Sequence, residues 1–230
     1  QNITTSLLTQ FYPSRTDLSI LDSGCGTGAA MFYLSPFGLV TGCDLALLAL
    51  QFCRQRDLES LSQATVMFLP FPGQAFDLVT SFDVLYHRDV KDRSRAMLEY
   101  NRVLKPGGRV FLRLAAYDWM RGAHDRAVHT AHRFTVAEVR ESLLSAGFVV
   151  ERVSYANTIL FPLAMIQRLW ESILVTEKAR SDLHSSPSWA NGFLAGILRL
   201  EAAWLKRHSL PWGLSVIAIG RKESPQSLRS

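Results

Sequence analysis

Cysteine is scarce in this chain, which has only Cys25, Cys43 and Cys53 among its 230 residues. The number is odd, and the spacing does not match that of metal-binding motifs. The pattern therefore argues against a disulfide framework of the secreted type and against a zinc site. We expect a reduced, cytoplasmic protein that holds no metal ion.

Long apolar runs are also missing. None reaches the ~20 residues that a membrane-spanning helix requires, and the longest, residues 158–166, contains Pro162. Residues 1–19 lack a basic start followed by an apolar run, so we expect no signal peptide. The formal net charge is +5, but lysine and arginine form no long block. This predicts a basic, solvated surface rather than a nucleic-acid-binding stretch, and it leaves contact with an anionic membrane open.

Short apolar runs alternate with stretches of helical periodicity along most of the chain. We predict strands at residues 18–24, 39–44, 64–70, 76–82, 109–115, 148–154 and 214–220. Helices are predicted at 3–11, 29–35, 47–56, 92–104 and 135–147, the last one starting with a Thr135/Glu138 capping box. This order predicts an α/β fold with a parallel sheet covered on both faces.

The segment between the last two predicted strands is longer than a connection needs, at about 60 residues. It contains two predicted helices, at 160–178 and 189–207, and we describe residues 156–210 as an inserted helical cap. The second helix places Trp189, Phe193, Ile197, Leu200 and Trp204 on one stripe. Such a cap either packs as a second small core or covers a substrate and touches a membrane. We expect one domain over 1–220 and a disordered tail at 221–230.

A dense glycine motif, ILDSGCGTG at residues 20–28, follows the first predicted strand. At the first strand–helix turn of a doubly wound sheet, glycine lets a ligand approach the backbone closely. Asp44 ends the next strand, where its carboxylate can accept both hydroxyls of a ribose. Gly24, Gly26 and Ala29 also satisfy the dinucleotide pattern, so a nicotinamide cofactor stays open. Asp22 argues against it, because a carboxylate repels pyrophosphate and suits an amine.

Three stretches together resemble class I S-adenosylmethionine-dependent methyltransferases. They are the glycine motif, LPFPGQAFDLVTSFDVLYH at 69–87 and MLEYNRVLKPGGRVFL at 97–112. Their order and spacing are similar to the methyltransferase type 11 group, which includes the ubiquinone and menaquinone methyltransferases. The resemblance implies a Rossmann-like, doubly wound sheet of seven strands, with the last strand antiparallel and a helical insertion between strands six and seven.

The resemblance also implies which positions hold S-adenosylmethionine. Asp22 would contact the methionine amine, the three glycines would pass under the cofactor, and Asp44 would hold the ribose. The full implied set is Asp22, Gly24, Cys25, Gly26, Gly28, Asp44, Leu45, Thr65, Val66 and Phe82. One position departs from the family, since Thr65 stands where an acid usually reads the adenine amine.

Candidate catalytic groups follow the fourth and fifth strands. His87 occupies a position where the family often has histidine, and it either acts as a base or holds the turn. Residues 115–135 are rich in polar and aromatic side chains, among which His124 with Asp125 is our first choice for an oriented base. For the acceptor we choose Tyr117, Trp119, His129 and Arg133. Asp125, His129 and His132 would share a face if the stretch is helical, and hydrogen bonding within the loop is the alternative for all of them.

These patterns predict an enzyme that transfers a methyl group from S-adenosylmethionine to a small molecule, apolar or lipid-linked. The alternatives are an S-adenosylmethionine-binding partner subunit without activity, suggested by Thr65, and a nicotinamide oxidoreductase. No N/D-P-P-Y motif follows the fourth strand, where SFDV stands at 81–84, and this argues against methylation of nucleic-acid bases. We expect a cytoplasmic location with membrane contact through the helical cap. The sequence does not indicate an oligomeric state.

Overall fold

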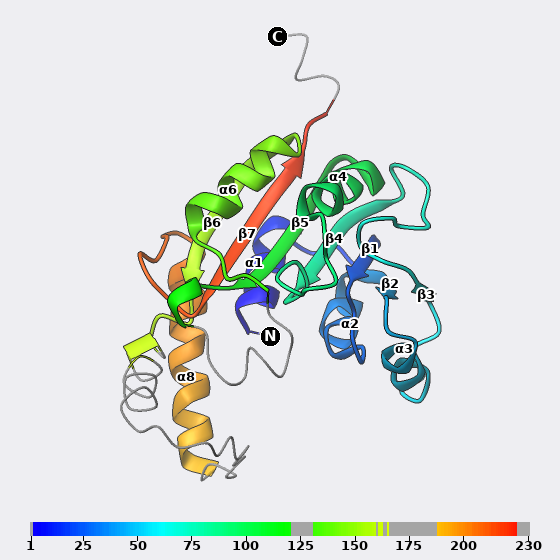
Figure 1. Ribbon diagram of the computed structural model, residues 1–230. Coiled ribbons are helices and arrows are strands. Elements are labelled where there is room, and N and C mark those ends of the chain that lie inside the picture. Colours follow the sequence, from blue (N-terminus) through cyan, green and yellow to red (C-terminus); the bar gives the residue numbers. More distant parts are fainter. Residues whose placement is uncertain (1, 121–130, 160, 163–164, 166–187, 225–230) are drawn as a thin grey trace, which may run out of the picture.

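The computed structural model describes residues 2–120, 131–159, 161–162, 165 and 188–224. Seven strands form one sheet in the order β3-β2-β1-β4-β5-β7-β6 (Figure 1). Neighbouring strands are parallel, except that β7 runs antiparallel to both β5 and β6. The strands are β1 Leu18–Ser23, β2 Gly38–Asp44, β3 Leu61–Gln63, β4 Phe76–Phe82, β5 Leu104–Ala115, β6 Phe148–Ala156 and β7 Ser215–Lys222. The Rossmann-like fold and the antiparallel last strand are confirmed.

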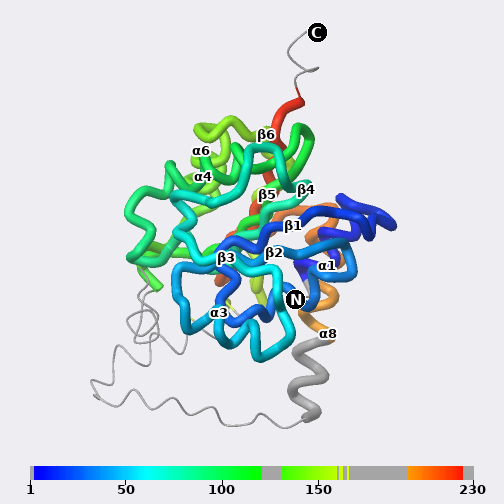
Figure 2. The backbone as a smooth tube through the Cα atoms, turned by 90° about the vertical axis from the view of Figure 1, so that its right-hand side faces the viewer, coloured from blue at the N-terminus to red at the C-terminus, as the bar shows by residue number. Residues whose placement is uncertain are grey.

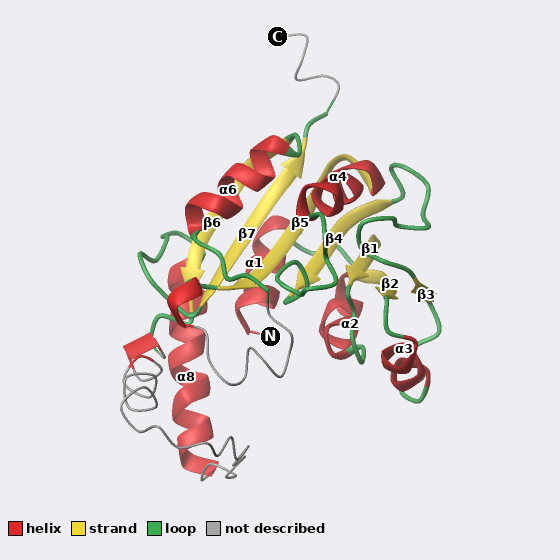
Figure 3. Ribbon diagram, viewed as in Figure 1, coloured by secondary structure: helices red, strands yellow, loops and turns green. Residues whose placement is uncertain are grey.

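Helices cover both faces of this sheet, which gives three layers (Figure 3). The helices are α1 Asn2–Phe11, α2 Ala29–Leu34, α3 Leu47–Arg54, α4 Arg93–Val103, α6 Val136–Ser145 and α8 Ser188–Leu205. Strand residues alternate between two apolar clusters: Leu21 packs with α4 and α6, and Ile20 with α1 and α2. Figure 2 shows α4 and α6 on one side of the sheet and α1 with α8 on the other.

Side-chain caps fix where two of these helices begin. Asp92 precedes α4 and accepts a hydrogen bond from the Arg95 backbone N–H at 2.9 Å. Thr135 and Glu138 form a complete capping box at the start of α6. The predicted start of α6 is therefore confirmed, and the chain before it is a connection from β5 at the sheet's functional edge.

The point where ligands bind in such a sheet lies between β1 and β4. The chain moves outward from β1 to β2 and β3, then crosses back to place β4 on the other side of β1. This reversal leaves a crevice at the carboxyl ends of the strands, because the loops after β1 and β4 leave in opposite directions. The glycine motif at residues 24–28 lies at that crevice, directly after β1.

The third strand is not where the sequence predicted it. β3 is Leu61–Gln63, and residues 64–70 form a loop instead of the expected strand. Side chains of α4 satisfy this loop's backbone: Glu99 accepts from the Leu69 N–H at 2.8 Å, and Arg102 donates to the Leu69 carbonyl at 3.0 Å. Apolar residues can therefore be buried here without a sheet partner.

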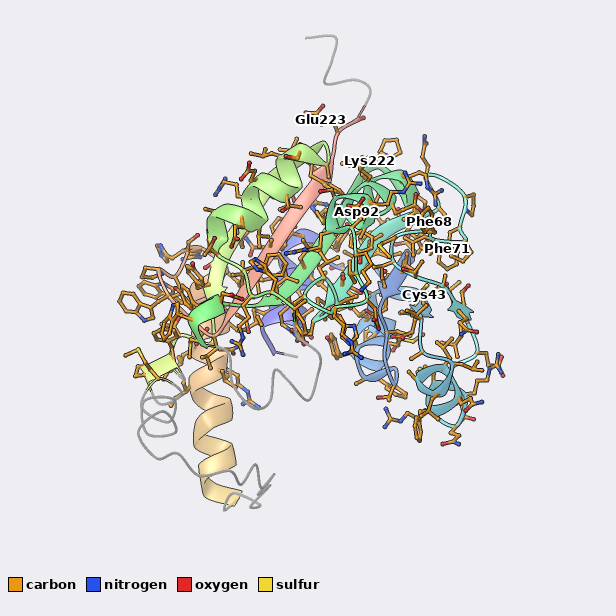
Figure 4. All side chains as sticks on the ribbon, in the orientation of Figure 1. Cys43, Phe68, Phe71, Asp92, Lys222 and Glu223 are labelled. Atoms are coloured by element: carbon orange, nitrogen blue, oxygen red, sulfur yellow. The ribbon has the colours of Figure 1, made fainter. Side chains whose placement is uncertain are left out.

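Several strand ends differ from the expected ones by one to five residues. β5 begins at Leu104, five residues before the predicted start at 109, and β7 runs to Lys222, two residues into the predicted tail. Lys222 lies beside α4 (Figure 4), and its Nζ donates to the carbonyls of Asn101 and Leu104 at 2.7 and 2.8 Å. These bonds hold the end of β7 in place. Residues 225–230 of the predicted tail lie outside the described residues.

Part of the predicted helical insertion is described. α8 matches the second predicted helix, while most of the first, at 160–178, lies outside the described residues. α8 packs against α1, and Arg152 of β6 donates to the last carbonyls of α8, those of Leu205 and Lys206. Within the described residues, no helix combines the length and the apolar character needed to cross a bilayer.

The predicted apolar stripe of α8 does not face the core. Leu200 is 73% exposed and Trp204 is 57% exposed, whereas Ala202 and Leu205 are buried. Helical periodicity identifies the stripe, but α1 contacts the neighbouring face, whose small Ala202 allows close packing. The side chains of Trp189 and Phe193 lie outside the described part of the structure.

Candidate functional site

A cavity of about 600 Å³ opens at the carboxyl ends of β1, β2 and β4. Its size falls in the range of small-molecule and cofactor sites. The lining residues are Gly24, Gly26, Asp44, Leu45, Ala46, Ala49, Ala64, Thr65, Val66, Phe82, Asp83, Val84, His87, Asp89 and Val90. All of them belong to segments that follow β1 to β4, so the cavity occupies the crevice that the topology creates.

The three motif glycines have positive φ angles but serve different purposes. A Cβ on Gly26 would meet no atom within 4 Å, so its missing side chain leaves open space for a ligand. A Cβ on Gly24 would lie 2.2 Å from Val84, and one on Gly28 would lie 2.3 Å from Leu58. Gly28 does not line the cavity. Its expected place under the cofactor stays a prediction, and the structure shows that its missing side chain permits packing against Leu58.

Asp44 ties the glycine turn to the end of β2. One carboxylate oxygen accepts from the Gly26 N–H at 2.8 Å, and the other accepts from the Ala46 N–H at 2.9 Å. These two bonds fix the orientation of the carboxylate in the cavity wall. Each oxygen keeps a lone pair, so Asp44 can still accept two hydroxyl donors.

Asp22, at the end of β1, is only 1% exposed and does not line the cavity. Its Oδ1 accepts from the Thr80 hydroxyl at 2.8 Å, and its Oδ2 is buried with no hydrogen-bond partner. Burial raises the pKa of Asp22 to about 6, against the lowering effects of Thr80 and Arg113. A carboxylate with one unsatisfied oxygen favours a nearby cation, which suits the amine that the sequence assigned to it.

The wall opposite the glycine turn is apolar, with one hydroxyl. Leu45, Thr65 and Val66 all line the cavity, as the resemblance implied. Thr65 Oγ1 accepts from the Met67 N–H at 3.4 Å, and the Thr65 carbonyl accepts from Phe68 at 3.0 Å. These bonds hold the turn that replaces the expected strand. The wall can therefore receive a planar apolar ring and offers no carboxylate to its edge.

Cys25 is placed differently from the other predicted cofactor residues. Its side chain is buried, and it does not line the cavity. The Cys25 N–H donates to the Cys43 carbonyl at 3.0 Å, next to the Gly24 N–H at 2.7 Å. Cys25 thus helps to shape the turn through its backbone, and its side chain belongs to the core.

The end of β4 adds polar residues that sequence reasoning missed. Phe82 lines the cavity as expected, and Asp83 beside it has φ 62° and lines the cavity too. Arg113 of β5 donates to one Asp83 oxygen from Nε at 3.0 Å and from Nη2 at 2.5 Å. Its guanidinium carbon also lies 5.0 Å from the centroid of the Phe82 ring. The position of Asp83 directly after a buried strand was the signal that could have found it.

His87 reaches the same cavity from the loop after β4. Its Nδ1 lies 3.3 Å from the Asp89 backbone N–H and 3.4 Å from an Asp89 carboxylate oxygen. Nδ1 accepts the hydrogen bond from the Asp89 backbone N–H, so Asp89 fixes the orientation of the ring. The structure therefore brings His87 to the cavity, with Asp89 holding its ring.

The polar segment after β5 is described only in part. The catalytic candidates His124 and Asp125, together with His129, lie outside the described residues. Arg133 holds the segment in place: its N–H donates to Asp118 at 3.1 Å and its Nη1 to the Ala116 carbonyl at 3.0 Å. His132 Nε2 lies 3.2 Å from Glu138, at the start of α6. Neither Arg133 nor His132 lines the cavity.

Tyr117 and Trp119 belong to an aromatic group beside this segment. The Tyr117 ring stacks on Tyr155 at 4.9 Å and meets Phe161 at 5.6 Å, and Trp119 lies 6.2 Å from Phe161. Tyr117 has φ 57°, and Trp119 is 62% exposed. The group follows the carboxyl ends of β5 and β6, on the same edge of the sheet as the cavity.

Comparisons with known proteins agree on one family. Residues 21–112 match the type 11 methyltransferase domain. Demethylmenaquinone methyltransferase of Lactococcus lactis is 41% identical over 106 residues, which cover 41% of this chain and 41% of that protein. The tRNA (carboxymethyluridine(34)-5-O)-methyltransferase of Arabidopsis thaliana is 29% identical over 148 residues, 64% of this chain and 35% of that protein. The matched part thus spans well under half the length of these relatives.

The fold extends the likeness over nearly the whole chain. Phosphoethanolamine N-methyltransferase 2 of Haemonchus contortus, solved in complex with S-adenosyl-L-methionine, superimposes with a TM-score of 0.60 at 21% identity. The superposition covers 97% of this chain and 52% of that one. At this identity the likeness concerns the fold. Residues 21–112 thus match the type 11 methyltransferase domain, and nearly the whole chain has the fold of a solved methyltransferase that binds S-adenosyl-L-methionine.

Proposed function

We propose that this protein transfers a methyl group from S-adenosylmethionine to a small, apolar or lipid-linked acceptor. The observation that carries the proposal is the pairing of Gly26 with Asp44 in the cavity wall. Gly26 leaves open space where a side chain would stand, and its N–H orients a carboxylate with two free lone pairs. A nucleoside that lies against the glycine turn can donate its two ribose hydroxyls to that carboxylate.

The other cavity residues fit the rest of the cofactor. Thr65 and Val66 line the wall that would receive the adenine, where a hydroxyl and backbone groups replace the usual acid. The unpartnered Oδ2 of Asp22 gives the methionine amine a buried acceptor next to the turn. When bound, S-adenosylmethionine supplies a methyl group that is already activated for displacement. The chain then needs to align the acceptor, exclude water and remove a proton where the acceptor is a hydroxyl or a carbon acid.

Two groups are proposed for the proton. His87 is favoured by its place in the cavity wall and by Asp89, which can orient its ring. His124 with Asp125 remains the alternative that we expect from the sequence. His87→Asn tests the choice, because it removes the base and keeps a polar side chain of similar size in the cavity wall. If His87 is the base, kcat falls by about 100-fold at unchanged cofactor affinity, and an unchanged kcat would assign the proton to the pair.

The aromatic group around Tyr117 supports an apolar acceptor. Four rings, those of Tyr117, Trp119, Tyr155 and Phe161, gather at the functional edge of the sheet. Aromatic side chains at the mouth of a site bind flat, apolar molecules and leave few hydrogen-bonding requirements. A relative named for demethylmenaquinone is consistent with this acceptor class. The basic, unclustered surface gives no support to a nucleic-acid acceptor.

Calorimetric titration tests the cofactor first. We expect S-adenosylmethionine and S-adenosylhomocysteine to bind with micromolar affinity and NAD not to bind. Asp44→Ala should weaken binding by about 100-fold, because two hydrogen bonds to a charged group are lost. Asp17→Ala, which removes an exposed aspartate far from the cavity, is the matched control. Binding of NAD in place of S-adenosylmethionine would support the oxidoreductase alternative.

A second assay separates an enzyme from a binding subunit without activity. The protein is incubated with methyl-labelled S-adenosylmethionine and a lipid extract or an aqueous extract of cells. Label that enters the organic phase, at a rate lowered by Asp44→Ala, supports methylation of an apolar acceptor. Label that enters only aqueous products would contradict the acceptor class. Tight cofactor binding with no transfer to either extract would favour the inactive subunit.

A further inference from the structure

The outward face of α8 exposes large apolar side chains next to basic ones. Leu200 and Trp204 lie one turn apart on this face, and both are more than half exposed. Arginine and histidine side chains flank them. The exposed residues at this spacing form what we call the α8 stripe: Arg199, Leu200, Ala203, Trp204, Arg207 and His208.

Backbone geometry keeps the stripe in one piece beyond the helix end. The N–H groups of Arg207 and His208 both donate to the Trp204 carbonyl, at 3.1 and 3.0 Å. The chain therefore continues to turn after Leu205. The His208 ring lies 4.7 Å from the Trp204 ring. The stripe is thus a continuous surface rather than two separate groups of exposed residues.

The opposite face of α8 is fixed, so the stripe cannot turn inward. Leu205 is fully buried in the cluster that contains α1. Glu201 is 4% exposed, and its Oε1 accepts from the backbone N–H groups of Asn157 and Thr158. Arg152 holds the carbonyls at the end of the helix. Three elements, α1, β6 and the loop after β6, therefore set the rotation of α8 about its axis.

The charge of this surface has one sign. Glu201 is the only acidic residue between positions 196 and 210, and it is buried on the opposite face. The exposed charges of the stripe are all cationic or, for His208, able to become so. A tryptophan and a leucine between basic residues is the composition of helices that lie in the interface of anionic membranes.

We propose that the α8 stripe docks this protein onto the surface of an anionic lipid bilayer. Trp204 and Leu200 enter the headgroup region, while Arg199 and Arg207 contact lipid phosphates at its edge. Charge complementarity selects this occupant over a second copy of the chain, because two copies would oppose the same cationic stripe and the same net charge of +5. The proposal does not depend on the proposed methyl transfer, and the cofactor is absent from its test.

The test is flotation of the full chain with vesicles of phosphatidylcholine alone or of phosphatidylcholine enriched in phosphatidylglycerol. We expect binding to the anionic vesicles and little binding to the neutral ones. Arg199→Gln/Arg207→Gln should lower the anionic partition coefficient by about 30-fold, and added salt should have a similar effect. Leu200→Ser/Trp204→Ser should lower it at least 10-fold, and Trp204→Phe should reduce the blue shift of tryptophan fluorescence on binding.

The matched control removes two exposed leucines from the other side of the sheet. Leu98→Ser/Leu144→Ser changes residues of α4 and α6 that are 47% and 57% exposed, close to the exposure of the stripe. We expect wild-type vesicle binding from this variant. Circular dichroism and the unfolding temperature show that each variant is folded. Equal loss in the control, or equal binding to neutral and anionic vesicles, would overturn the proposal. So would a dimer, seen by light scattering, that Leu200→Ser/Trp204→Ser dissociates while vesicles fail to bind.

Discussion

Among the described residues, the cavity wall comes from the ends of β1, β2 and β4 and from the segments that follow β1 to β4, whereas β5 to β7 and α8 contribute none of its lining. In the first region, backbone N–H groups position the site: those of Gly26 and Ala46 donate to the Asp44 carboxylate. The second region instead exposes tryptophan side chains, those of Trp119, Trp204 and Trp212. The contrast suggests that one half of the sheet provides a cofactor site common to many enzymes, and the other half adapts it to a particular acceptor and surface.

The largest effect is expected from Gly26→Ala, which should lower cofactor affinity. Comparing it with Gly28→Ala distinguishes a glycine that leaves space for the ligand from one that permits packing. At Gly26 the new Cβ meets no protein atom, so stability changes little beyond the cost of the positive φ, about 1 kcal/mol. The methyl group occupies space that the cofactor needs, and affinity should fall by at least 100-fold. Titration calorimetry and thermal unfolding measure both quantities.

At Gly28 the expectation is reversed. The new Cβ would lie 2.3 Å from Leu58, so the free energy of unfolding should fall by about 1–3 kcal/mol. Cofactor affinity measured well below the unfolding temperature should change by less than 10-fold. Adding Leu58→Ala to Gly28→Ala should recover part of the stability, and a double-mutant cycle measures the coupling. If both glycine variants lose affinity equally, the distinction between the two positions fails.

Asp22 makes the free energy of unfolding depend on pH. Its pKa is raised by burial to about 6, so the native state binds more protons than the unfolded state between about pH 4 and pH 6. The contribution of Asp22 to stability is therefore full at low pH and is lost as the pH rises through about 6, a change of about 1–3 kcal/mol. Asp22→Asn should remove this part of the slope when urea unfolding is compared across pH 4 to 7.

The same residue predicts how affinity depends on pH. A bound amine favours the ionised form of Asp22, so the affinity for S-adenosylmethionine should rise as the pH increases from 5 to 7. Asp22→Asn should bind more weakly and show a flatter profile. A wild-type profile that is flat over this range, with Asp22→Asn bound as tightly, would contradict a contact between Asp22 and the amine.

The difference between the two halves also explains what could be predicted from the sequence. Gly26, Asp44 and Phe82 were predicted to share one site and do line one cavity, because local backbone chemistry dictates residues at the strand ends. The strand at 64–70 was wrong because Glu99 and Arg102, about thirty residues away, satisfy that loop. The packing of Gly28 against Leu58 could not be predicted, because only the fold reveals that contact. The helical periodicity of the sequence predicted the apolar stripe of α8. Which way the stripe faces depends on where α1 packs, and the sequence does not reveal this.

Glu201→Ala tests whether the second half is structurally independent of the cofactor site. The buried carboxylate accepts from Asn157 and Thr158, and its loss leaves two buried N–H groups unpaired. The free energy of unfolding should fall by about 1–2 kcal/mol, and vesicle binding should weaken as α8 loses its fixed rotation. Cofactor affinity should stay within about 3-fold of wild type. A large loss of cofactor affinity would show that the two halves are coupled through the sheet.

Thr135→Ala should have the smallest effect and compares the two halves through their helix caps. Thr135 and Glu138 exchange hydrogen bonds at the start of α6, so removing the hydroxyl should cost about 1 kcal/mol of stability. Asp92→Ala removes the cap of α4 and should cost a similar amount, because Asp92 accepts one bond from Arg95. Cofactor affinity distinguishes the two variants. The loop that contains His87 and Val90 lines the cavity and leads into α4, whereas the described start of α6 does not reach the cavity. A measurable loss of cofactor affinity is therefore expected from Asp92→Ala alone. Equal affinities of the two variants would show that α4 does not influence the cofactor site.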